Sequence, residues 1–272
     1  MHKDKEEQKF KPYNGNNVLI TPNDILNILE KCEVIDLKID SLKNFQMAFV
    51  HKSYCKKKFE GNEHLLEDKP YNYVDLQEEH NERIEFLGDS IVNAVTNTYL
   101  YRRYKKQDEG FMTKLKTKLI SGEFLALFAK FLGLKKFILL SRHVENTNGR
   151  NNDRILEDVF ESFIGALYLD HGFNACRQFI YYILNTQVDW ADIIQYENNF
   201  KDILMKYFQK QKWPYPVYKE INITGPPNNR IFTIGIYDQD NNLIGTGTGH
   251  TKKKCEQIAA HQALIKLNIV NY

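Results

Sequence analysis

The spacing of the apolar residues changes near residue 191, and this change constrains the fold more than any other feature of the 272-residue chain. From about residue 24 to residue 189, apolar residues recur mainly every three or four positions, which is typical of helices that bury one face. Beyond residue 191, one amphipathic helix precedes three strand-like runs, which are separated by turn signals and followed by a last helix. The sequence therefore predicts an all-α domain and then a small α+β domain of α-β-β-β-α order.

The boundaries of these parts follow from the same pattern. We expect a polar N-terminal arm at 1–23, a helical domain at 24–190, a linker at 191–197 and the α+β domain at 198–270. Thr21 can cap the first helix, because its hydroxyl can accept a hydrogen bond from a backbone N–H group of the first turn. The segments 54–82 and 141–153 lack a clear period, which indicates loops. In the α+β domain we expect helices at 199–212 and 251–268 and strands at 217–223, 230–237 and 243–249.

The composition favours an intracellular, cytoplasmic protein. No stretch approaches the roughly 18 consecutive apolar residues of a membrane span, and the polar start has no apolar core of a secretory signal. The four cysteines lie far apart and in no Cys/His cluster, which disfavours a zinc site or a disulfide framework. We expect them to be reduced packing residues: Cys32, Cys55, Cys176 and Cys255.

The two parts of the chain differ in charge. The net charge of the whole chain is +2, but from residue 200 onward ten basic residues face five acidic ones, so this part carries +5 and residues 1–199 carry −3. A basic module joined to an acidic one fits a phosphate-binding domain beside a domain that concentrates carboxylates. On charge alone, ordinary variation of the surface explains the difference equally well.

Two pairs of acidic residues lie at helical spacing. Glu85 and Asp89 are four positions apart, and Asp158 and Glu161 are three apart, so each pair projects from one face of its helix. Carboxylates on mainly apolar helices are costly unless a cation compensates them, and hard oxygen ligands suit Mg²⁺. Spacing alone favours two solvated helix faces over a metal site. Glycines within these two helical runs, Gly88 and Gly165, indicate that the helices approach something closely.

The motifs around these carboxylates resemble those of the ribonuclease III family. The run HNERIEFLGDS at 80–90 is similar to the long signature of that family. Three further motifs follow the family's order: AFVHKSY at 48–54, EG at 109–110, and DVFE at 158–161 with IGA at 164–166. The resemblance covers roughly residues 40–185. The long insertion at 54–82 departs from the bacterial pattern and could alter the choice of substrate.

The resemblance implies roles for individual residues. It makes Glu85, Asp89, Asp158 and Glu161 the metal-binding carboxylates. Glu82 and Glu109 match supporting acidic residues at the edge of the catalytic site, and Phe86 matches an aromatic residue that inserts into a partner subunit, which implies a homodimer. The expected cofactor is Mg²⁺, for which Mn²⁺ can substitute, and the expected products carry 5′-phosphate and 3′-hydroxyl ends with a short 3′ overhang.

The C-terminal part resembles a double-stranded-RNA-binding domain over residues 198–268. The resemblance rests on the run GTGHTKKKCEQIAAHQAL from residue 247, with Gly225, Pro226 and Phe232 upstream. In that family the lysines at the start of the last helix contact phosphates of an RNA duplex. The implied RNA contacts are Gln209, Asn228, Lys252, Lys253 and Lys254. Three departures could weaken binding: Asn228 replaces a usual histidine, Glu256 a frequent lysine and Met205 a frequent glutamine.

The leading hypothesis is a metal-dependent endoribonuclease that hydrolyses double-stranded RNA. The main alternative is a non-catalytic protein that binds and sequesters RNA duplexes. The four intact carboxylates argue against it, because a protein that only binds a polyanion gains nothing from them. A nuclease for DNA is disfavoured by a module whose contacts need 2′-hydroxyl groups.

Overall fold

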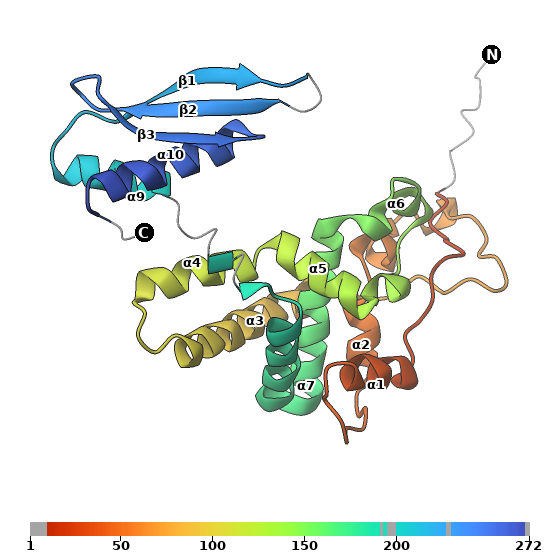
Figure 1. The fold of residues 1–272 in the computed structure, drawn as a ribbon. Helices are drawn as coiled ribbons and strands as arrows, with labels where there is room; N and C mark the ends of the chain where they lie inside the picture. The colour runs from red at the N-terminus through yellow and green to blue at the C-terminus, as the bar shows by residue number, and fades with distance from the viewer. Residues whose placement is uncertain (1–9, 191–192, 195–199, 227–229, 270–272) are drawn as a thin grey trace, which may run out of the picture. The chain divides into compact units, whose positions relative to one another are not determined.

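The chain forms two compact units, Met1–Asp189 and Trp190–Tyr272, and each is described by itself. The computed structural model describes residues 10–190, 193–194, 200–226 and 230–269. Most of the predicted linker at 191–197 lies outside the described residues. The first unit is helical and the second combines helices with one sheet, which confirms the predicted fold class (Figure 1).

Helices and short 3₁₀ turns make up the regular structure of the first unit, apart from isolated β-bridges. The α-helices are α1 (Pro22–Glu30), α2 (Leu42–Ala48), α3 (Glu82–Arg103), α4 (Glu109–Leu119), α5 (Gly122–Leu132), α6 (Arg142–Asn146) and α7 (Asp153–Thr186). The 3₁₀ turns are η1 (Lys52–Tyr54), η2 (Lys56–Phe59), η3 (Glu63–Leu65), η4 (Leu134–Phe137) and η5 (Gly149–Asn151). Helix α6 lies within the segment 141–153, so the prediction that this whole segment is a loop is wrong.

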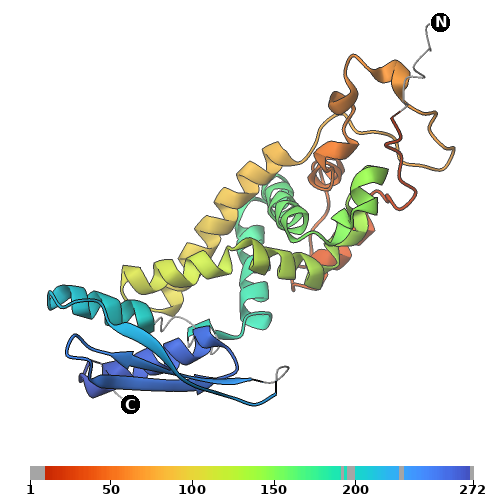
Figure 2. The same ribbon diagram turned by 90° about the horizontal axis from the view of Figure 1, so that it is seen from above.

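Helix α7 forms the centre of this unit, and α2, α3 and α5 pack against it (Figures 1 and 2). Its residues from Val159 to Leu167 are all buried, because neighbouring helices cover every side of this stretch. Gly172 interrupts the helix with a φ of 71°, a conformation that glycine adopts without steric cost. The stretch before this kink carries Asp158 and Glu161.

The start of the chain is better packed than its composition indicates. Thr21 caps α1 in a reciprocal arrangement with Asp24, which confirms the predicted helix start. The expectation of a loose arm is wrong for residues 10–20, because Asn14 and Asn17 are buried and both donate hydrogen bonds to the carbonyl of Leu140. These bonds satisfy polar groups that would otherwise be costly to bury.

The insertion between Tyr54 and Glu82 is attached to the helical unit and is not simply an exposed loop. Phe59 and Leu76 are buried in a small apolar cluster that also contains Tyr54. The phenol of Tyr54 donates a hydrogen bond to the carbonyl of Val74 at 2.7 Å. The apolar residues of this segment therefore anchor it, although they follow no helical or strand period.

The second unit has the predicted α-β-β-β-α order. Its elements are α9 (Phe200–Lys210), β1 (Val217–Thr224), β2 (Ile231–Tyr237), β3 (Leu243–Gly249) and α10 (Lys252–Lys266). The strands form an antiparallel sheet of order β1-β2-β3, and the helices pack on one face of it (Figure 1). A Cβ atom on Gly247 would overlap the carbonyl oxygen of Cys255, so this glycine allows α10 to lie close to β3.

The cysteines serve as packing residues in both units, as the sequence predicts. All four are free and buried. Burial raises the pKa of Cys32 and of Cys176 to about 12, so neither thiol ionises near neutral pH. Among the described helices, none is both long enough and apolar enough to cross a membrane.

Candidate active site

The predicted carboxylates lie where α3 and α7 come into backbone contact. A Cβ atom on Gly88 of α3 would overlap the carbonyl oxygen of Glu161, and one on Gly165 of α7 would overlap the carbonyl oxygen of Ile84. The two helices can therefore meet only because both positions are glycine. This contact confirms the close approach that the glycines indicate in the sequence.

The structure brings the four carboxylates together from these two helices. Glu85 and Asp89 lie on α3, and Asp158 and Glu161 lie on α7. The Asp89 carboxylate accepts a hydrogen bond of 2.7 Å from Asn93 and is exposed. Glu161 is only 9% exposed, and its carboxylate has no hydrogen bond or ion pair within the described part of the chain. A buried acid without a partner is unusual and requires compensation.

Burial and mutual repulsion raise the pKa values of three of these groups. Burial raises the pKa of Glu161 to about 8, and the charges of Asp89 and of other acids add to this effect. Burial and then the charge of Asp158 raise the pKa of Glu85 to about 7. The pKa of Asp158 rises to about 6, again first through burial. The cluster therefore holds protons at pH values at which ordinary carboxylates are ionised.

Glu157 is a further acid of this cluster that the sequence reasoning missed. Its charge contributes to the raised pKa values of Glu85, Asp158 and Glu161. Its own pKa is raised, first by burial. Its carboxylate lies against Gly122 at the start of α5, where a Cβ atom would overlap its oxygen. In the sequence, only its position directly before Asp158 indicates that Glu157 belongs to the cluster.

The two supporting acids, Glu82 and Glu109, occupy different surroundings. Glu82 is the first residue of α3 and accepts a 3.1 Å hydrogen bond from Lys52, which lowers the pKa of Glu82. Lys52 belongs to the AFVHKSY motif. Its positive charge also partly offsets the rise in the pKa values of Glu85 and Asp158. Glu109 is the first residue of α4, where Thr113 donates a hydrogen bond to it. It is not among the largest electrostatic influences on Glu85, Asp158 or Glu161.

The donor set suits a divalent cation, although the side chains do not form a ready-made site. Across residues 10–190 and the described parts of the second unit, no three His, Cys, Asp or Glu side chains converge closely enough to hold a metal ion as they stand. Carboxylates that repel one another do not converge unless a cation offsets their charge. Their oxygen atoms are the ligands that Mg²⁺ and Mn²⁺ prefer, and such a cation would favour the ionised form of Glu161, whose pKa is otherwise raised.

The predicted RNA contacts lie mainly on the helices of the second unit. Lys252, Lys253 and Lys254 form the first turn of α10, which Thr251 caps. Gln209 lies on α9, where its amide donates a hydrogen bond to the hydroxyl of Tyr215. Asn228 lies outside the described residues. The three lysines add their positive charge to the positive end of the helix dipole, which favours phosphate groups.

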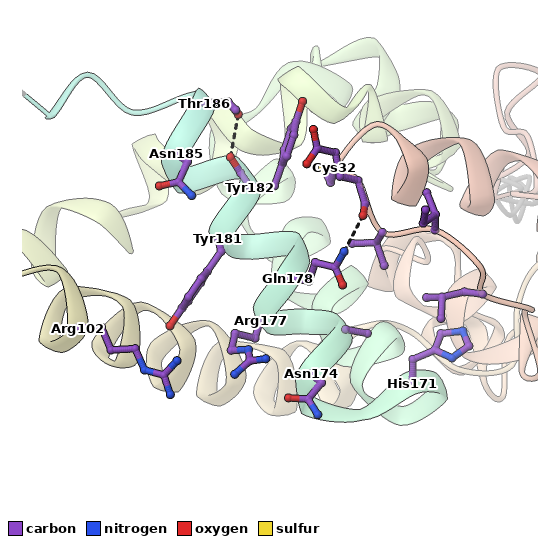
Figure 3. Close-up of a pocket in the computed structure, with 15 residues that line it drawn as sticks. Cys32, Arg102, His171, Asn174, Arg177, Gln178, Tyr181, Tyr182, Asn185 and Thr186 are labelled. Carbon is purple, nitrogen blue, oxygen red and sulfur yellow. Dashed lines mark hydrogen bonds between the residues drawn. The ribbon is translucent and has the colours of Figure 1, made fainter.

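A large hollow of the helical unit lies away from the carboxylates. It has a volume of about 890 Å³ and is lined by residues that follow α1, by Arg102 of α3 and by the second half of α7. Figure 3 shows Tyr181 of α7 pointing toward Arg102, and Gln178 donating a hydrogen bond to the carbonyl of Glu33. None of the six predicted acids lines this hollow.

Comparisons with known proteins match both units to described families. Residues 43–187 match the family described as Ribonuclease-III-like, and residues 200–267 match the double-stranded RNA binding motif. The first match covers the four carboxylates, and the second covers the start of α10. Both ranges agree with the parts of the sequence that carry the resemblances.

Individual relatives give the same result. The chain is 36% identical over 260 residues to a protein named Probable ribonuclease 3 from Acanthamoeba polyphaga mimivirus. The match covers 94% of this chain and 47% of that protein, so the chain spans about half the length of this relative. It is 34% identical to Ribonuclease 3 of Streptococcus equi subsp. zooepidemicus, covering 86% of this chain and 95% of the relative. A solved nuclease domain of ribonuclease III from Campylobacter jejuni is 29% identical, with a TM-score of 0.46, and covers 60% of this chain and 98% of that one.

Proposed function

Because this chain belongs to the ribonuclease III family of double-stranded-RNA endoribonucleases, we propose that Glu85, Asp89, Asp158 and Glu161 form its catalytic centre for the hydrolysis of duplex RNA. The observation that carries this proposal is the Glu161 side chain, which is only 9% exposed and has no hydrogen bond or ion pair among the described residues where α3 meets α7. A protein that only bound RNA would have no use for a buried acid. The alternative of a non-catalytic binding protein is therefore disfavoured.

The cofactor of this centre is a divalent cation, and Mg²⁺ is the form that we propose, with Mn²⁺ as a substitute. Ribonucleases of this family depend on divalent metals. When bound, such an ion lowers the pKa of water and neutralises charge on the phosphate. The oxygen atoms of Glu161 and of Asp158 on α7, together with those of Glu85 and Asp89 on α3, would hold it.

The surrounding residues tune the charge of the centre. Lys52 holds the Glu82 carboxylate at its edge, which keeps this acid ionised. The close contact of Gly88 with α7 fixes the separation of the two acidic helices.

The expected products of the proposed hydrolysis carry 5′-phosphate and 3′-hydroxyl ends with a short 3′ overhang.

The second unit supplies affinity for the duplex. Its family match supports binding of double-stranded RNA, and we propose that Lys252, Lys253 and Lys254 at the start of α10 contact the phosphates. Gln209 and Asn228 are the further contacts that we propose. Duplex DNA lacks the 2′-hydroxyl groups that such modules contact in the minor groove.

The active form is proposed to be a homodimer. Phe86 lies on α3 directly after Glu85 and is 79% exposed, so its ring is available for a contact with a second copy. A second copy of the chain would bury this ring. We propose that Glu109, which is not among the largest electrostatic influences on the acids of its own chain, supports the catalytic centre of the second copy.

The direct test is cleavage of a labelled RNA duplex by the full-length chain with and without Mg²⁺. Wild-type protein should cleave only with the metal, and Glu161→Gln should bind the duplex without cleaving it. Ca²⁺ should permit binding without turnover, because this larger ion tolerates looser geometry. Cleavage by Glu161→Gln at the wild-type rate would refute the assignment of the site. Binding without cleavage by the wild-type protein in Mg²⁺ would favour the sequestering alternative.

A further inference from the structure

Lys252 does not present a free ammonium group to an RNA duplex. Its Nζ atom lies 2.8 Å from Oε2 of Glu220 on β1 and 5.5 Å from the centre of the Phe232 ring on β2. This lysine is the first residue of α10, so the pair stands at the helix start that the proposed function assigns to phosphate contacts. An acid of the same unit therefore already binds one of the proposed RNA contacts.

The register of the sheet explains the position of Glu220. Glu220 pairs across the strands with Ile234, which is 4% exposed and belongs to the side of the sheet covered by helices. Residues that pair directly across strands project from the same face. An irregularity between Glu220 and Asn222 then shifts the register of β1. The Glu220 carboxylate thus lies on the helix-bearing face, beside the start of α10.

This contact has a consequence for RNA binding because both side chains remain accessible. The side chain of Lys252 is 60% exposed and that of Glu220 is 36% exposed. A phosphate can therefore reach the ammonium group while the carboxylate stays beside it, and the two negative groups repel each other. We propose that Glu220 limits the affinity of this unit for duplex RNA by competing with an RNA phosphate for Lys252. The inference rests on the proposed function, in which α10 contacts the duplex.

The chain offers a charge-matched control in Asp240. This acid lies in the same unit, in the turn between β2 and β3, and its side chain has no ion pair in the described part of the unit. Asp240→Asn removes the same charge as Glu220→Gln but leaves Lys252 paired. Glu256 is less suitable, because its 2.5 Å ion pair with Lys201 joins α10 to α9.

The test measures binding of full-length variants to an RNA duplex of about three helical turns without divalent metal, at several KCl concentrations. Glu220→Gln should bind up to about fivefold more tightly than wild type, the upper end of what an exposed ion pair contributes. The slope of log K against log salt should steepen by up to about 0.9, which corresponds to one additional phosphate contact. Asp240→Asn should change the affinity by less than half as much.

A second pair of variants makes the inference specific to Lys252. In a Lys252→Gln background, Glu220→Gln should have no more effect than Asp240→Asn. The proposal is overturned if Glu220→Gln and Asp240→Asn are indistinguishable in the wild-type background. A loss of affinity on Glu220→Gln also overturns it, because Glu220 would then orient the lysine. A wild-type chain that binds no duplex RNA at any salt concentration would instead overturn the proposed function.

Discussion

A Cβ atom on Gly88 would overlap the backbone carbonyl oxygen of Glu161, so the contact between α3 and α7 admits no side chain at this position. Because the obstacle is backbone, rotation of a neighbouring side chain cannot relieve the overlap. The same contact sets the positions of Glu85 and Asp89 relative to the acids of α7. We therefore expect both stability and catalysis to depend on this glycine.

Gly88→Ala should lower the free energy of unfolding by about 1–3 kcal/mol, the usual cost of overpacking a core. It should also reduce cleavage, because the two helices must separate. The matched control is Gly110→Ala on α4, whose Cβ atom would make only an ordinary 3.5 Å contact with Asp108. This control should be neutral or slightly stabilising, since alanine favours helix. Denaturant unfolding of both variants would settle the matter, and equal midpoints would contradict the predicted overlap.

The raised pKa of Glu161 predicts how stability depends on pH in metal-free protein. In the folded chain the Glu161 carboxyl group has a pKa of about 8 and keeps its proton below this pH. In the unfolded chain it loses the proton near its ordinary pKa of 4.5. Folded protein thus holds more protons between these values, so the free energy of unfolding should fall as pH rises from about 5 to 8. Glu85 and Asp158 act in the same direction.

Glu161→Gln should therefore lose less stability than wild type over this pH range. At pH 8 in a chelator, the variant should be the more stable protein, because its amide has no charge to bury. Thermal unfolding at several pH values measures the difference. Parallel pH profiles for the two proteins would show that Glu161 titrates normally in the folded state.

Glu157→Gln should weaken metal binding without abolishing cleavage. Glu157 contributes negative charge to the cluster from its position against Gly122, and its loss should lower the attraction for a divalent cation. We expect a higher Mg²⁺ concentration for half-maximal cleavage and a nearly unchanged maximal rate. Calorimetric titration with Ca²⁺ gives a readout that is independent of activity. Glu123→Gln on α5 is the control, since Glu123 is not among the largest electrostatic influences on Glu85, Asp158 or Glu161, and identical metal dependence of both variants would exclude this role.

The sequence predicted the elements and residues whose signals are local. Helical spacing placed Glu85 with Asp89 and Asp158 with Glu161 on common faces, and the glycines at 88 and 165 indicated the close approach of α3 and α7. Periodicity and turn residues likewise predicted the order of helices and strands in the second unit. These signals depend only on neighbours within a few positions along the chain.

Features that depend on distant partners could not be predicted in this way. Asn14 and Asn17 are polar residues of the kind that is typical of a loose arm. They are held in place by hydrogen bonds to the carbonyl of Leu140, which lies more than 120 positions away in the sequence. Glu157 belongs to the acidic cluster because the start of α5 packs against it, and no spacing rule links it to Gly122. The charge of Lys252 suggested a free contact, whereas the fold pairs it with Glu220.

The division of labour between the two units gives the last prediction. Residues 200–272 carry the +5 excess and the lysines of α10, so neutralising Lys252 and Lys253 to glutamine should weaken duplex binding and flatten its salt dependence by about 0.9 per lost phosphate contact. Removal of residues 191–272 should act in the same direction and raise the RNA concentration needed for cleavage.

The control is a second lysine pair in the helical unit. Neutralising Lys105 and Lys106, which are exposed between α3 and α4, removes the same charge from the helical unit and should have a smaller effect. Single-stranded RNA and duplex DNA should compete poorly. Filter binding at several salt concentrations measures these effects, and equal losses for the two lysine pairs would show that the second unit is not the main source of affinity.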